Sequence, residues 1–152
     1  MAELTSRREY DVDVDFGGFA LQDTDDRHVP VRFPEGFQRG AFLAALPGRL
    51  DFTSAAHTHT VAFTVEVWDA EPPLPLGDWE AAATVDTFTS SGQLRARSVA
   101  GGPMLDRIPL ADHSSTWSVR VVCTDRAAMA EHDEEELAEG IEQYLAQFWP
   151  AA

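Results

Sequence analysis

Three stretches of this chain alternate apolar and polar residues with a period of two, and this alternation constrains the fold more than any other feature. They are residues 10–16, 58–68 and 117–124. Successive side chains of a β-strand point to opposite faces of its sheet, so each stretch predicts a strand that buries one side only. In the first stretch the outward side carries three carboxylates in a row, Asp11, Asp13 and Asp15.

Short segments bounded by turn residues fill the remainder of the middle of the chain. We expect two short strands within 42–52 around a Pro47-Gly48 turn, a hairpin of 79–89 and 93–99 around Ser90-Ser91-Gly92, and a strand at 106–110. The proline-rich stretch 71–77 cannot join a ladder of hydrogen bonds, so it predicts a stiff surface loop. Strands at this spacing, with no helices between them, indicate a mainly β fold, an antiparallel β-sandwich of about seven to eight strands.

The C-terminal segment has a different period. An apolar stripe at helical spacing and an acidic pair that resembles a capping box predict one amphipathic helix over 133–149, ended by Pro150. The stripe is Leu137, Ile141, Tyr144, Leu145 and Phe148, and the pair is Asp133 with Glu136. Such a helix would dock on a sandwich spanning about 10–124. We therefore expect residues 1–152 to form a single domain, since 152 residues suffice for one core.

The acidic charge of the chain is concentrated. The formal net charge is −15, and residues 9–26 and 131–142 hold fourteen of the twenty-six acidic residues and none of the arginines. A protein charged in this way is repelled by nucleic acids and by anionic membranes and is attracted to basic partners. We expect a basic protein partner that binds at Asp11, Asp13, Asp15, Glu131, Asp133, Glu134, Glu135 and Glu139.

Two further observations concern the cellular compartment. Cys123 is the single cysteine, so no disulfide can form within the chain, which favours a reducing environment. The first ten residues are polar, unlike a signal peptide, and no apolar run approaches the roughly 18 residues of a membrane span. These features predict a cytoplasmic protein.

Catalytic and metal-binding patterns are sparse. His57 and His59 would share one face of a strand and could hold a zinc ion, but the sequence supplies no companion ligands. The Asp11–Asp15 row lacks the glycine and the final glutamate of an EF-hand loop, although it could take calcium adventitiously. Cys123 falls on the apolar side of its strand and is expected to be a buried, unreactive thiol. We therefore predict no enzyme, no cofactor and no resident metal.

The order of elements between about Gly40 and Thr124 resembles the competence protein J family. The resemblance rests on the strand and turn at 41–52, the strand at 60–68, the pair 79–85 and 92–96, Ile108-Pro109-Leu110, and the last strand at 117–123. Members of this family inhibit a DNA-entry nuclease. The resemblance implies a non-enzymatic partner protein that occupies the basic groove of a nuclease, and it assigns no individual residue.

The function we favour from the sequence is therefore an acidic binding protein, an inhibitor or immunity-type partner of a basic protein such as a nuclease. Carboxylates would stand in for phosphates. Two alternatives stay open. One is a sandwich that binds a small ligand in a pocket lined by Trp68, Trp79 or Trp117. The other is a metal-dependent enzyme centred on His57 and His59.

Overall fold

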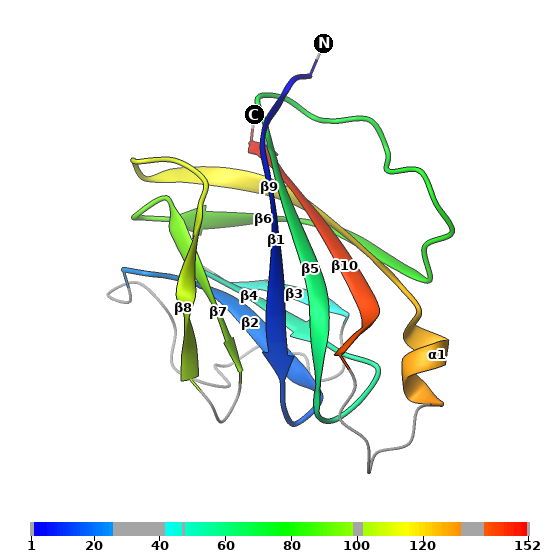
Figure 1. Cartoon of the computed structure of the whole chain (residues 1–152). Helices are drawn as coiled ribbons and strands as arrows, with labels where there is room; N and C mark the ends of the chain where they lie inside the picture. Colours follow the sequence, from blue (N-terminus) through cyan, green and yellow to red (C-terminus); the bar gives the residue numbers. More distant parts are fainter. Residues whose placement is uncertain (1, 26–41, 47, 99–101, 132–138, 152) are drawn as a thin grey trace.

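Two five-stranded sheets pack face to face in the computed structural model, which describes residues 2–25, 42–46, 48–98, 102–131 and 139–151 (Figure 1). Sheet A has the order β1 (Leu4–Val14), β5 (His59–Trp68), β10 (Glu139–Pro150), β9 (Ser115–Thr124), β6 (Ala81–Thr89). Sheet B has the order β3 (Leu43–Leu46), β4 (Arg49–Thr53), β2 (Gly18–Asp23), β7 (Gln93–Ser98), β8 (Gly102–Pro109). The expected mainly β sandwich is confirmed, but the described residues form ten strands, not about seven to eight, and the β5–β10 pair is parallel in otherwise antiparallel sheets.

The three alternating stretches are strands of sheet A. β1, β5 and β9 turn their apolar side into the space between the sheets, where Val12, Phe63 and Val119 are at most 1% exposed. The alternation predicted for residues 10–16 ends at Val14, the last residue of β1. Phe16 adopts a positive φ of 51° and is 63% exposed, because the chain turns there toward β2.

Four aromatic rings lock the two sheets together. Phe19 and Phe52 come from sheet B and stack with their ring centroids 4.7 Å apart, whereas Phe63 and Tyr144 come from sheet A and stack at 5.7 Å. The two pairs meet at near right angles, and Phe19 lies 5.8 Å from Phe63. Such offset and edge-to-face contacts add to the stabilisation that burial of the rings provides.

The predicted C-terminal helix over 133–149 is wrong from residue 139 onward, because Glu139–Pro150 is a strand, β10. It lies between β5, to which it is parallel, and β9, to which it is antiparallel. A central strand covered on both sides carries apolar residues on both faces, and over a short window these also fit a helical period. Residues 133–138 lie outside the described part of the chain.

The short helix α1 (Arg126–Ala130) is the helix that the described residues contain, and it precedes β10. Within those residues no helix has the length and apolar character needed to cross a membrane.

The predicted hairpin at Ser90-Ser91-Gly92 is also wrong. β6 pairs with β9 in sheet A, and β7 pairs with β2 and β8 in sheet B, so these residues carry the chain from one sheet to the other. A local turn signal is the same whether the flanking strands pair with each other or with strands of two different sheets. Gly92 is required there, since a Cβ atom would lie 2.4 Å from the carbonyl oxygen of Ala111.

Asp23, at the end of β2, holds this crossing in place. Its buried carboxylate accepts hydrogen bonds from the Ser90 N–H at 2.6 Å, the Ser90 hydroxyl at 3.0 Å, the Asp25 N–H at 3.0 Å and the Ser91 hydroxyl. Burial raises the pKa of Asp23, but hydrogen bonds to Ser91, Asp25, Ser90 and Thr89 together lower it further, so the pKa lies below its ordinary value. Asp23 thus belongs to an acidic segment of the sequence but is used internally.

We predict that Asp23→Asn lowers the free energy of unfolding by about 1–3 kcal/mol at neutral pH, because the amide nitrogen would face donors. A folded-state pKa below the unfolded one stabilises the protein above about pH 3.9. That contribution disappears as the pH falls through the folded pKa. Urea unfolding at several pH values should therefore show a constant deficit near neutrality that shrinks below about pH 4.

Asp86→Asn is the matched control, because the exposed Asp86 accepts a single hydrogen bond, from Ser118 at 2.7 Å. Its unfolding free energy should stay within about 0.5 kcal/mol of the parent. Equal behaviour of the two variants across this pH range would contradict the role given to Asp23.

Candidate functional site

An exposed acidic face lies at one end of sheet A, and we call Asp11, Asp13 and Glu139 the acidic face. Asp11 and Asp13 project outward from β1, at the edge of the sheet, while Val12 and Val14 point into the core. Neighbouring carboxylates on one side of a strand are about 6.6–7 Å apart. The sequence prediction that these two aspartates face outward is therefore correct in geometry.

The register of sheet A brings the two acidic segments of the sequence together. Thr60 of β5 is in register with Asp13 on one side and with Glu139 of β10 on the other. Two strand spacings separate the backbones of Asp13 and Glu139, which is about 10 Å. This distance is comparable to the Debye length at physiological ionic strength, so their potentials add. The Thr60 hydroxyl donates to a carboxylate oxygen of Asp13 at 3.0 Å.

The other predicted partner-binding residues are placed differently. Asp15 follows β1, is half-buried and forms a bridge with Gly18, and Glu131 is exposed at the C-terminal end of α1. Asp133, Glu134 and Glu135 lie outside the described residues.

Four arginines of the described residues pair with other acids. Arg7 pairs with Glu66, Arg49 with Asp51 at 2.8 Å, Arg120 with Glu71 at 3.9 Å, and Arg126 with Glu142 at 3.6 Å. Within the described ranges, none of the ion pairs involves Asp11, Asp13 or Glu139. Within the described residues, no arginine therefore neutralises the carboxylates of the acidic face.

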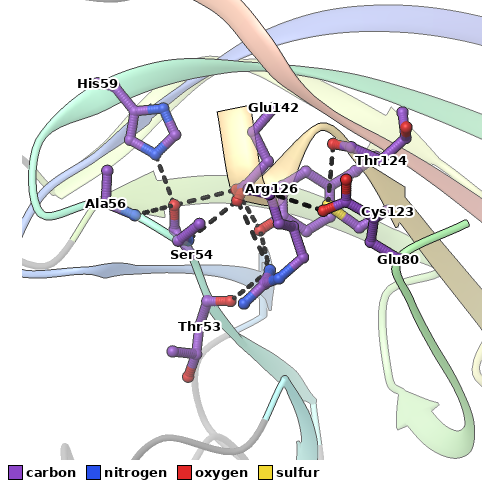
Figure 2. A network of polar contacts seen from close by, with 12 residues as sticks. Thr53, Ser54, Ala56, His59, Glu80, Cys123, Thr124, Arg126 and Glu142 are labelled. Atoms are coloured by element: carbon purple, nitrogen blue, oxygen red, sulfur yellow. Dashed lines mark hydrogen bonds and ion pairs between the residues drawn. The ribbon is translucent and has the colours of Figure 1, made fainter. Parts of the chain in front are cut away.

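Glu142 belongs to the acidic segment 131–142 of the sequence. Its side chain nevertheless lies in the interior of the fold (Figure 2). It is fully buried, and its carboxylate accepts hydrogen bonds from Ser54 at 3.0 Å, Tyr144 at 2.5 Å and the Ala55 N–H at 2.9 Å. Burial and the charge of Glu142 raise the pKa of Tyr144 far above its ordinary value, so its hydroxyl stays protonated and donates.

Arg126 completes this buried network. Its guanidinium donates to the Thr53 carbonyl at 3.1 Å and lies 5.1 Å from the centre of the Phe42 ring. Because Thr53 ends β4 of sheet B, whereas Glu142 belongs to β10 of sheet A, the network fastens the two sheets together next to the acidic face. A period-two count through Glu142, Tyr144, Ala146 and Phe148 is the sequence signal that could have placed Glu142 inside.

The two histidines proposed as metal ligands lie in different surroundings, one exposed and one buried. His57 precedes β5, is exposed, and contacts Phe16 edge-on at 5.1 Å between ring centroids. His59 is buried and its Nε2 lies 2.5 Å from the Ser54 hydroxyl (Figure 2). Ser54 donates to Glu142, so it accepts from His59, an arrangement that differs from the Ser–His–acid order of a hydrolase. Across the described residues no three His, Cys, Asp or Glu side chains are grouped to hold a metal.

Cys123 faces the core, as expected. It is fully buried, and burial together with the nearby Glu142 charge raises the pKa of its thiol to about 12. Since the thiolate is the reactive form, this cysteine cannot serve as a nucleophile near neutral pH.

A groove of about 500 Å³ lies beside the acidic face on the outer side of sheet A. It is lined by Arg7, Glu9, Tyr10, Asp11, Ala62, Phe63, Thr64, Trp79, Gln143, Tyr144 and Leu145. Of the three tryptophans proposed to line a pocket, Trp79 does so. Trp117 is buried in the core, and the Trp68 indole N–H donates to Glu66 at 3.1 Å. Glu9 and Gln143 are groove residues that the sequence analysis did not single out.

The fold and the site together define a mainly β sandwich with an outward carboxylate cluster. No protein-family model and no curated protein sequence matches the chain. A solved structure similar to it is that of ComJ from Bacillus subtilis, an inhibitor of the DNA degrading activity of NucA. The identity is 12% over 99% of each chain and the TM-score is 0.63. A second is described as crocagin biosynthetic gene J, 11% identical over 100% of this chain and 99% of that chain, with a TM-score of 0.65.

These two likenesses show a shared fold. The resemblance to the competence protein J family, which the sequence suggested for residues 40–124, is confirmed at the level of architecture and extends over nearly the whole chain.

We predict that Glu142→Gln destabilises the protein by about 3 kcal/mol or more, because it removes the charge that compensates Arg126 and turns an amide nitrogen toward donors. Glu139→Gln on the same strand is the control, and since Glu139 is exposed its change should be within about 0.5 kcal/mol. Urea unfolding of both variants measures this difference. A Glu142→Gln protein as stable as Glu139→Gln would show that the network does not hold the sheets.

Proposed function

We propose that this chain is a non-enzymatic binding protein that inhibits a basic partner protein, such as a nuclease, by occupying its cationic surface with the acidic face. The observation that carries the proposal is the placement of Asp11, Asp13 and Glu139. They come from two distant segments, Asp13 and Glu139 lie on either side of Thr60, and none of the ion pairs of the described residues involves them.

Electrostatics also explains how such an inhibitor would find its target. A cluster of like charges on a rigid sheet presents a fixed potential, and complementary potentials raise the rate of association more than they raise affinity. The acidic face does not need to reorganise, because the buried network of Glu142 and Arg126 anchors the strand that carries Glu139.

The structural neighbours support the same kind of function. ComJ is an inhibitor of the DNA degrading activity of a nuclease, and its fold covers this chain from end to end. Because the two sequences are only 12% identical, the partner of this chain has to be inferred from its own surface. The second neighbour belongs by its name to a biosynthetic gene set, so one fold serves more than one cellular setting.

The experiment uses NucA, the nuclease that ComJ inhibits, and in parallel any nuclease that is encoded beside the gene for this chain. DNA hydrolysis is measured with increasing amounts of the purified protein, and the association rate is measured by stopped flow at several salt concentrations. We expect inhibition of one nuclease, with an association rate that falls at least about tenfold between low and high salt.

Charge reversal at the acidic face provides the specific test. Asp11→Lys with Asp13→Lys should lower the association rate by about tenfold or more, because two attractive charges become repulsive. Asp86→Lys with Asp112→Lys changes the net charge equally at exposed sites outside the acidic face and should have a much smaller effect. Equal effects of the two double variants, or a rate indifferent to salt, would exclude the proposed mechanism.

A further inference from the structure

The groove on the outer side of sheet A has an aromatic wall that is fixed in place. The Trp79 indole N–H donates to the Pro75 carbonyl at 3.1 Å, and a Cβ atom on Gly77 would lie 3.3 Å from the indole ring. The ring therefore packs closely against its own loop. A rigid ring presents its face to a ligand without loss of side-chain entropy on binding.

The loop that carries Trp79 is itself fastened to sheet A. Arg120 of β9 donates to the carbonyls of Pro72 at 3.2 Å and of Pro73 at 3.4 Å. The same guanidinium donates to Gln147 at 3.0 Å and lies 5.2 Å from the centre of the Trp149 ring. The connection from β5 to β6, which runs out beyond β10 in Figure 1, is thus tied down near its start and carries the groove wall near its end.

The same groove is lined by two carboxylates. Glu9 and Asp11 line it from β1, and Gln143 adds an amide from β10. Arg7 also lines the groove, but its charge is matched by Glu66, which is itself only 8% exposed. In the part of the chain that the structure describes, no arginine pairs with Glu9 or Asp11. The groove therefore has an excess of negative charge.

A groove that combines an indole ring, two carboxylates and an amide matches one chemical group closely. A guanidinium is planar, stacks on aromatic faces, donates five hydrogen bonds and is always charged. An ammonium group can use the carboxylates but offers no flat surface to the indole. A volume of about 500 Å³ is enough for such a side chain with part of its backbone.

We propose that the groove binds an arginine side chain of the basic protein partner, with its guanidinium between Trp79 and the carboxylates of Glu9 and Asp11. This inference rests on the proposed function and names the contact that gives it specificity. The acidic face supplies long-range attraction, and the groove selects arginine over lysine.

The probes are blocked tetra-arginine and tetra-lysine peptides, titrated into the isotopically labelled full chain and followed by NMR. We expect tetra-arginine to shift the Trp79 indole N–H and the amides of Asp11 and Gln143, and to bind about threefold more tightly than tetra-lysine. The preference corresponds to a cation–π contribution of roughly 0.5–1 kcal/mol.

Two matched pairs of variants locate the site. Asp11→Asn should weaken tetra-arginine binding severalfold more than Asp13→Asn, because both residues are exposed on β1 but Asp13 does not line the groove. Trp79→Ala should weaken it by about two- to fivefold, whereas Leu74→Ala, an exposed change in the same loop, should not. Equal losses for Asp11→Asn and Asp13→Asn, without a shift of the Trp79 indole, would overturn the groove as the site.

The failure of this inference is distinguishable from the failure of the proposed function. A nuclease that is inhibited in a salt-dependent manner but is indifferent to Trp79→Ala would leave the acidic-face mechanism standing and overturn the arginine site.

Agmatine, which carries a guanidinium without a peptide, is the remaining probe. If agmatine binds more tightly than tetra-arginine, the guanidinium that the groove binds does not come from a protein.

Discussion

The insertion of β10 between β5 and β9 is the interaction on which the remainder of the structure depends. Without it, β1 and β5 would be separate from β9 and β6, and sheet A would not exist as one surface. The strand is buried on both sides, by Tyr144 and Phe148 toward the core and by Gln147 and Trp149 on the outer side. Its position sets Glu139 beside Thr60 and gives the groove its floor at Gln143 and Leu145.

β10 carries a buried carboxylate, that of Glu142, and the need to compensate buried carboxylates determines where several of the arginines lie. A carboxylate removed from water must be paired and hydrogen-bonded, so Glu142 takes Arg126 and Glu66 takes Arg7. Arg120 is used to hold the loop of Trp79. These three arginines therefore stabilise the fold, and carboxylates that they do not pair with remain at the surface.

The parts of this arrangement that could be predicted from the sequence are those that depend on local periodicity. β1, β5 and β9 each bury one side, and their period of two gave both their existence and the outward direction of Asp11 and Asp13. β10 is harder to recognise in this way, because consecutive residues are buried at 146–149, and its period of two is visible only through Glu142, Tyr144, Ala146 and Phe148. The turn at Ser90-Ser91-Gly92 was recognised, but the sheet that each flanking strand joins is decided by long-range pairing.

The position of β1 at the edge of sheet A offers a simpler explanation for its aspartates, which is protection against pairing with another chain. Charged side chains on an edge strand do discourage such pairing. That explanation does not extend to Glu139, which begins the central strand β10 and pairs there with Thr60 of β5. It also does not account for the groove that Asp11 and the fixed indole of Trp79 both line. We propose recognition of a cationic protein surface as the common explanation, because Asp11, Asp13 and Glu139 supply carboxylates there and Trp79 lines the groove beside them.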